Sequence, residues 1–498
     1  MNTRSYEDSL VEADRTRNAS ARRANLILLG LFVLSLPLVN PWVRGDGVGY
    51  YAYARALLIE RRLDFTQDYL HANQRFREAR LDERNRPRPD FRTATGRLEN
   101  HFSVGPAILW SPFLLAAHAG ALLARSLGSS VAADGFSAPY RIAMSFATAL
   151  YGFLALLFSF RLACRYAEWK WAFLATVGVW GASSLPVYMY FNPSWSHAHS
   201  AFTVAIFLCY WHKTRGGQTF LRWLLLGGLA GLMLNVYYAN AMVLVAPGVE
   251  ALLEYAKRLR GPTRDWAGAA RLVAVHTAFL MVILVCLLPT FITRQIIYGA
   301  PFQSGYIPLK NWLWSAPALL PVLFSSNHGL FSWTPILLPA SAGLLLLAFY
   351  RPNVGGPLLA AAIVFYSFVA CYPNWDGISS YGNRFFVSLT PLFILGLAVF
   401  LQRLASAFGR KHAVIPISVL LVGLFVIWNI GFMFQWGMHL VPARGPISWN
   451  EMVHNQFVAV PRQVGESIRS YLFHRSALMK SIERKDLEQW RDSPENKP

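Results

Sequence analysis

The sequence predicts an all-α membrane protein that crosses the bilayer many times. Of its 498 residues, 54% are hydrophobic and only 14% are charged, whereas a soluble protein carries about 25% charged residues. Apolar runs of about 20 residues recur along the chain, and each is long enough to span a hydrocarbon core of roughly 30 Å. Because these runs are long and continuous, they favour helices over the short alternating strands of a membrane barrel.

The apolar pattern predicts eleven membrane crossings, at approximately 24–43, 139–160, 171–190, 198–212, 219–238, 240–255, 268–290, 331–350, 357–372, 385–402 and 413–433. Basic residues test this count, because Lys and Arg gather in cytoplasmic loops. If the N-terminus is cytoplasmic, the basic short loops all fall on the cytoplasmic side, and the opposite short loops are nearly free of Lys and Arg. Membrane orientation therefore explains the net charge of +20, and we assign no nucleic-acid partner.

One apolar segment, residues 101–124, is left out of the count. It contains Pro106, Pro112 and His118, and counting it as a crossing would place every later basic loop outside. We therefore expect a re-entrant or interface-lying helix, although the segment could still span if another crossing were miscounted.

The crossings divide the chain into three parts. Residues 1–23 are a cytoplasmic segment without the features of a cleavable signal. Residues 24–433 are the transmembrane domain, in which 44–138 form one large non-cytoplasmic loop. Its YYAYARALLIERRLDF stretch is expected to be an amphipathic helix on the membrane surface. Residues 434–498 are an outer tail with a mixed-charge helix from about Ser476 to Trp490.

The first candidate for chemistry is Asp46, which lies between two glycines directly after the first crossing. Glycines would allow a substrate to approach the backbone, and a carboxylate there could take a proton from an attacking hydroxyl or amine. A solvated aspartate in a turn is the simpler alternative, since Asp-Gly is common in loops. Tyr50 and Tyr51 follow on the same stretch as candidate substrate contacts.

Histidines mark two further outer loops. His197 and His199 in SWSHAHSAF could contact a phosphate or a sugar, or form structural hydrogen bonds. A divalent metal is the weaker alternative, because only two ligands are visible and a closed site needs about four. His328 stands in LFSSNHGLFSWTP, where the chain re-enters the membrane. A turn with aromatic interface anchors explains it as well as a ligand role does.

Arg384, in NWDGISSYGNRFF, lies at the outer mouth of a predicted crossing. Arginine suits bidentate contact with phosphate, and an outward arginine runs against the charge bias, so we favour a ligand role over snorkelling to the interface. Asp376 is the candidate partner of Arg384. A less specific polar group that could line an outer cavity consists of Arg294, Gln295, Tyr298, Gln303, Tyr306 and Lys310.

An outward carboxylate, outward histidines and an outward arginine together fit a reaction on a phosphate-linked lipid. The lipid tail would lie between helices, and its head group would face outward. Nucleotide sugars and ATP are not expected outside the cytoplasm, so an activated group must arrive there on a carrier.

The order of these motifs resembles that of GT-C integral-membrane glycosyltransferases. DGVGYYAYARAL, just after the first crossing, is similar to their first outer loop. HFSVGPAILWSPFLL and YGNRFFVSLTPLFILGLA are similar to segments of bacterial members near the protein O-mannosyltransferase and aminoarabinose transferase groups. The resemblance covers most of residues 24–433. It implies a multi-pass protein of the bacterial inner membrane that moves a sugar from a polyprenyl-phosphate carrier to a glycan, lipid or protein acceptor on the periplasmic face.

The resemblance also implies residue roles. Asp46 would be the general base, and direct displacement would invert the sugar carbon. Arg384, with Arg294 or His101, would hold the carrier phosphate. Relatives often place another acidic residue in the second outer loop, but this chain has none between Phe191 and Ser200. We expect no obligatory metal or other cofactor, because carrier-monophosphate members generally look metal-independent.

Two other classes of function fit the same outward polar residues. A flippase of lipid-linked sugars would also need access from the inner leaflet, yet few polar residues other than Asn235 lie deep in the predicted crossings. A ligase that moves a whole glycan from a pyrophosphate-linked lipid would favour more arginines in the outer cavity. Asp46→Asn discriminates between these classes, because it should abolish transfer but be tolerated by a flippase.

Overall fold

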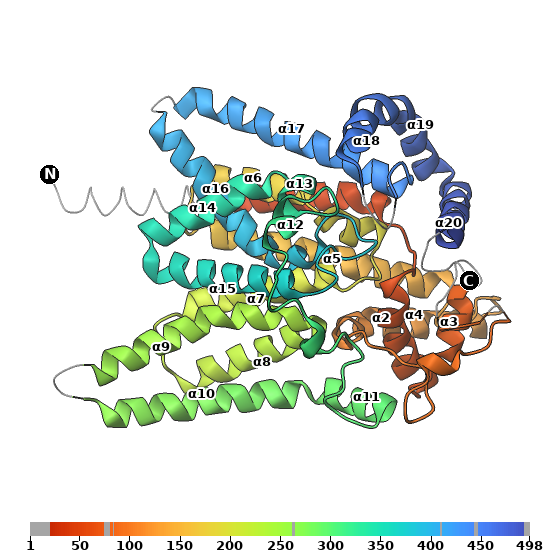
Figure 1. The fold of residues 1–498 in the computed structure, drawn as a ribbon, viewed down its shortest axis with the longest axis horizontal. Helices are drawn as coiled ribbons and strands as arrows, with labels where there is room; N and C mark the ends of the chain where they lie inside the picture. The colour runs from red at the N-terminus through yellow and green to blue at the C-terminus, as the bar shows by residue number, and fades with distance from the viewer. Residues whose placement is uncertain are drawn as a thin grey trace.

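The computed structural model describes residues 20–73, 80–82, 84–260, 264–408, 411–442 and 447–492. The described residues form helices joined by loops, with two isolated β-bridges and no named strand. The all-α prediction is therefore confirmed. Long helices run side by side along the longest axis of the molecule, and short helices gather at one end with α2 (Asp46–Arg55) (Figure 1). We call that end of the bundle the site end.

Each of the eleven predicted crossings corresponds to a helix. These helices are Ser20–Leu38, α5 (Ala138–Ala163), α6 (Trp169–Ala182), α7 (His197–Thr214), α8 (Phe220–Val236), α9 (Val245–Leu259), α10 (Trp266–Cys286), α14 (Leu337–Tyr350), α15 (Pro352–Cys371), α16 (Thr390–Ala407) and α17 (Lys411–Gly437). Seven helices in the described part of the chain, α4 (Gly105–Ser126) among them, are long and apolar enough to cross a membrane. The helices α8 and α14 are shorter but also apolar.

The basic short loops meet at the end of the bundle opposite α2. The Arg215 side chain, between α7 and α8, donates to the carbonyl of Asn353 at the start of α15, and the backbone N–H of Glu168, between α5 and α6, donates to Gln402 near the end of α16. These contacts join four of the predicted basic loops in two pairs, and the cytoplasmic orientation of the basic loops stays a prediction.

Helix α16 lies at the centre of the bundle, where it packs on α14, α5 and α6. It approaches α14 backbone to backbone: a Cβ at Gly343 would lie 1.8 Å from the carbonyl oxygen of Gly396, and a Cβ at Gly396 would lie 2.1 Å from that of Ala340. Small residues allow such close packing between membrane helices. A 3-10 segment over Arg384–Leu389 leads directly into α16. This segment is therefore attached to the closely packed core of the bundle.

The apolar helix α4 runs alongside α5 in the opposite direction. It begins against the site end of α8, where a Cβ at Gly105 would lie 2.4 Å from the backbone of Asn235. Further along, the indole of Trp110 donates to Thr148, and His118 hydrogen-bonds Tyr140 near the start of α5. The helix is also one of the seven that are long and apolar enough to cross a membrane, so a re-entrant or interface-lying placement of α4 stays a prediction.

The helix after the first crossing differs from the expected surface helix. Helix α2 continues into a wider turn over Ala56–Glu60, and every residue from Gly47 to Ala56 is buried. It is covered by α4, by α3 (Thr66–Asn73) and by the loop around Gly135, whose carbonyl accepts a hydrogen bond from Tyr51. The prediction of an amphipathic surface helix is wrong here, because the large first loop folds over the tyrosine-rich face.

The tail folds into three helices at the site end: α18 (Trp449–His454), α19 (Val460–Phe473) and α20 (Arg475–Asp492). The helix predicted from about Ser476 to Trp490 is confirmed as α20. The remaining short helices are α11 (Leu288–Tyr298), α12 (Leu319–Phe324) and α13 (Leu330–Trp333). Most of the predicted cytoplasmic segment, and residues 493–498, lie outside the described residues.

Candidate active site

A cavity of about 1620 Å³ opens at the site end. Six residues singled out from the sequence line it, and they come from separate parts of the chain: Asp46, Tyr50, His101, His197, Tyr306 and Arg384. The fold therefore brings the first outer loop, the start of α7 and the segment before α16 to one space.

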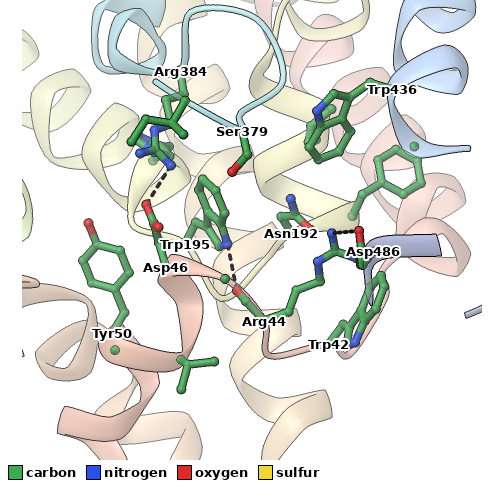
Figure 2. A pocket seen from close by; sticks show the side chains of 18 of the residues that line it. Trp42, Arg44, Asp46, Tyr50, Asn192, Trp195, Ser379, Arg384, Trp436 and Asp486 are labelled. Carbon is green, nitrogen blue, oxygen red and sulfur yellow. Dashed lines mark hydrogen bonds and ion pairs between the residues drawn. The ribbon is translucent and has the colours of Figure 1, made fainter. Parts of the chain in front are cut away.

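The centre of the cavity is an ion pair between Asp46 and Arg384. A guanidinium nitrogen of Arg384 donates to a carboxylate oxygen of Asp46 over 2.7 Å (Figure 2). Asp46 opens the first turn of α2, where a negative side chain interacts favourably with the helix dipole. The predicted partnership of Arg384 with Asp376 is wrong, because Asp376 accepts hydrogen bonds from the Asn327 amide and from the backbone N–H of Ile378.

Arg384 keeps hydrogen-bonding capacity beyond its contact with Asp46. Its Nε is buried, and no described residue accepts a hydrogen bond from it. The guanidinium lies 4.7 Å from the ring centre of Trp195 and 5.7 Å from that of Phe385. A planar, aromatic-flanked guanidinium with a buried unused donor is suited to bind an anionic oxygen.

Trp195 separates this ion pair from a second one. Its indole N–H donates to the carbonyl of Arg44 over 3.0 Å, so the ring is held beside the linker that leads to Asp46. The glycine next to Asp46 serves this packing, since a Cβ at Gly47 would lie 1.9 Å from the Oγ of Ser194. Gly47 thus allows the approach of the loop before α7, rather than the approach of a substrate that the sequence suggested.

The second ion pair joins Arg44 to Asp486 of α20 at 2.9 Å. His439, which follows α17, also hydrogen-bonds Asp486, over 2.7 Å. Burial alone would raise the pKa of Asp486, but the charge of Arg44 and the hydrogen bond from His439 outweigh it and hold that pKa below its ordinary value. Sequence analysis missed this cluster, because no local pattern links residues 442 positions apart.

Two other lining residues are uncharged at neutral pH. His101 packs against Phe102 and Tyr306. Its burial disfavours the charged imidazolium and lowers the pKa of His101 to about 4. Burial raises the pKa of Tyr50, with the Asp46 charge acting in the same direction. His101 can therefore offer a neutral ring nitrogen, and Tyr50 a phenol hydrogen, but neither supplies a positive charge.

Several predicted site residues lie behind the cavity wall. His199 is buried between Trp110 and Tyr151, and His328 stacks on Trp333. Arg294 donates to the hydroxyl of Tyr238, which does line the cavity. Of the less specific polar group, Tyr306 lines the cavity, whereas the cavity wall does not include Gln295, Tyr298, Gln303 or Lys310.

No group of three or more His, Cys, Asp or Glu side chains that could hold a metal ion occurs among the described residues. His197 and His199 do not converge: the ring of His197 packs against Tyr188 and Tyr237, while His199 faces the α4–α5 side.

Comparisons with known proteins find several solved structures to which the chain is similar, including two from Archaeoglobus fulgidus. The chain aligns with the apo form of an Archaeoglobus fulgidus oligosaccharyltransferase at a TM-score of 0.45 and 14% identity, covering 96% of this chain and 58% of the other. It also aligns with the archaeal oligosaccharyltransferase AglB from Archaeoglobus fulgidus, solved with an inhibitory peptide and a dolichol-phosphate, at a TM-score of 0.39 and 13% identity, covering 94% of this chain and 56% of that one. No family model and no curated protein matches the chain.

Both solved neighbours are named as oligosaccharyltransferases. The chain spans less than three-fifths of their length. At these scores the likeness carries no argument about chemistry, which has to come from the residues of this chain.

Proposed function

We propose that this protein transfers a sugar from a polyprenyl-phosphate-linked donor to an acceptor on the outer face of the membrane. The observation that carries the proposal is the Asp46–Arg384 ion pair, because it places a carboxylate base beside an arginine in one cavity at the end of a membrane bundle. The buried, unused Nε of Arg384 supports a role in holding the donor phosphate.

The reaction is a direct displacement at the sugar carbon. The donor phosphate binds Arg384 and takes over the guanidinium contact that Asp46 makes in the resting protein. The released carboxylate accepts the proton of the acceptor hydroxyl as its oxygen forms the new bond to the sugar carbon. The bond from that carbon to the phosphate oxygen breaks, its electron pair leaves with the polyprenyl phosphate, and the sugar configuration inverts.

The surroundings of the pair support the same chemistry. Tyr50 and His101 can hydrogen-bond uncharged sugar hydroxyls, since burial keeps both neutral. Tyr238, backed by Arg294, presents a hydroxyl whose oxygen already accepts a hydrogen bond from the guanidinium. The basic loops at the opposite end support an N-terminus in the cytoplasm and a site on the periplasmic side of the bacterial inner membrane.

A flippase is the second candidate, because it too would hold a lipid-linked sugar. The interior of the bundle favours the transferase. Asn235, the polar residue noted deep in the crossings, is occupied by Thr290 and by the carbonyl of Cys286. It is therefore part of the packing rather than of a polar path.

The test is to purify the protein with its co-extracted lipids and identify bound polyprenyl-phosphate species by mass spectrometry. We expect a polyprenyl-phosphate sugar on the wild type and on Asp46→Asn, and its loss from Arg384→Ala. Asp134→Asn is the matched control, since its carboxylate oxygen only accepts backbone N–H groups, at Phe136 and Ser137, and an amide oxygen can replace it. Ordinary phospholipids alone in every sample would refute the transferase proposal.

A further inference from the structure

The cavity continues past Trp195 into a second, apolar chamber formed with the tail. Figure 2 shows Asp46, Tyr50 and Arg384 on one side of Trp195, and Arg44, Trp42 and Asp486 on the other. We call the second space the tail chamber. Its apolar walls come from the end of the first crossing, from α17, and from α19 and α20, and they include Leu38, Ile430, Met433, Ile468, Leu472 and Ile482.

The tail is bound to the first crossing by specific contacts. Arg475 donates to the carbonyls of Pro37 and Val39, and the hydroxyl of Tyr471 donates to that of Leu38. Asp486 then pairs with Arg44, two residues before Asp46. The apolar faces of α19 and α20 are thus held against the linker that carries the carboxylate.

Apolar side chains that line the tail chamber are exposed in the protein without a ligand. Ile468 is 52% exposed, and Ile430 and Leu472 are 44% exposed, although all three line the cavity. Bare apolar surface of this kind is characteristic of a site for an apolar ligand or a membrane contact. The whole cavity, at about 1620 Å³, also exceeds the roughly 300–1,000 Å³ of a pocket for one small molecule.

Displacement with inversion requires the acceptor to approach the sugar carbon from the side opposite the leaving phosphate. Two ligands must therefore reach Asp46 from two directions. On the Arg384 side, the cavity is lined by Tyr372, Phe385 and Trp312, which suits the donor because its phosphate binds Arg384. The tail chamber is the other approach, and apart from the Arg44–Asp486 pair near Trp195 the walls named above are apolar.

From this geometry, and resting on the proposed transfer function, we propose that the tail chamber holds the hydrocarbon chain of a lipid-anchored acceptor. The acceptor head group would reach Asp46 past Trp195, while the chain lies between α17 and α19–α20. The enzyme would then join two membrane lipids, rather than glycosylate a protein or a free polymer.

The experiment uses the full chain in nanodiscs that contain a phosphatidylglycerol with a diazirine in one acyl chain. Photolysis, digestion and mass spectrometry locate lipid adducts at Met433 and Met479, which both line the chamber. Ile430→Trp fills the chamber, and Ile427→Trp is the matched control, because Ile427 lies on the same helix but outside the cavity and is 66% exposed. Ile468→Trp repeats the block from the opposite wall.

We expect Ile430→Trp and Ile468→Trp to reduce labelling at the two methionines by about fivefold or more, because the indole occupies the space of the chain. Ile427→Trp should leave labelling unchanged, and all three variants should still retain the donor lipid. Membranes with wild-type protein, compared with Asp46→Asn, should contain a new glycolipid in the organic extract.

Absent or unaltered labelling at both methionines overturns the proposal. Loss of the donor from Ile430→Trp and Ile468→Trp also overturns it, because the chamber would then hold the donor chain. New sugar found only on protein or polymer excludes the lipid-anchored acceptor. Chamber labelling without any Asp46-dependent transfer would instead refute the transfer function and leave the lipid-chain site standing.

Discussion

Neutralising Asp46 should tighten the binding of the carrier phosphate while it abolishes transfer. In the resting protein a guanidinium N–H of Arg384 is engaged with the Asp46 carboxylate at 2.7 Å, so a phosphate must compete for that donor. A hydrogen bond between charged groups contributes about 1.5–3 kcal/mol. The Asp46 side chain is 31% exposed and that of Arg384 is 13% exposed, so solvent screening favours the lower part of this range.

We therefore expect Asp46→Asn to bind polyprenyl monophosphate roughly 10- to 30-fold more tightly than the wild type, which corresponds to about 1.5–2 kcal/mol. The measurement is a titration of purified protein in detergent with sugar-free polyprenyl monophosphate, followed by native mass spectrometry. Arg384→Ala should lose binding, and Asp134→Asn should match the wild type. Equal or weaker binding by Asp46→Asn would show that the ion pair does not compete with the phosphate, and the displacement step would be wrong.

Four further outcomes are expected. Asp486→Ala should loosen α20 by about 1–3 kcal/mol, because it removes the shared partner of two half-buried groups, Arg44 and His439. Faster amide exchange in α20 would show this, and Glu488→Ala, which changes an exposed residue, should not cause it. His101 has a folded-state pKa of about 4, against 6.5 for the free side chain. The stability that its neutral form contributes is therefore complete above pH 6.5 and is lost as the pH falls towards 4. The melting temperature of the wild type should fall more steeply over this pH range than that of His101→Phe. Gly343→Ala should lower the melting temperature through an overpacking cost of roughly 1–3 kcal/mol. Gly423→Ala, at an open position, should leave the melting temperature unchanged. Equal melting temperatures for the two variants would contradict the close α14–α16 contact. Sugar transfer should persist in EDTA, and its loss would require a metal that the described side chains do not gather.

The crossings were predictable because hydrophobic length and loop charge are local properties of the sequence. The helix positions and the mixed-charge helix in the tail follow from such patterns. Asp46 and Arg384 were each recognisable as outward polar groups. Their pairing across 338 residues was not, because proximity in sequence favoured Asp376 as the partner.

Burial around the site was the least predictable part. The alternation of tyrosine and alanine in α2 is compatible with a surface helix, and only the folding of the first loop over it buries that face. His199 and His328 stand in outer loops as His197 does, yet His199 is enclosed by Trp110 and Tyr151 from two other helices, and His328 stacks on Trp333 in the short helix that follows it. Which of several similar polar residues faces a cavity depends on packing between helices, and one sequence does not encode it locally.

The Arg44–Asp486 contact has a consequence for how the protein is made. Its two residues are 442 positions apart, and at a synthesis rate of about 5–20 residues per second the linker before Asp46 emerges roughly 20–90 s before its partner. Throughout that interval the carboxylate would sit beside an incomplete wall, open to bulk lipid. Premature termination before α20 would leave a product with every membrane helix inserted but without the partner that anchors Arg44. Such a product would be integrated in the bilayer and yet lack one wall of the cavity beside Asp46, so the cavity is complete only after translation has passed the last membrane segment.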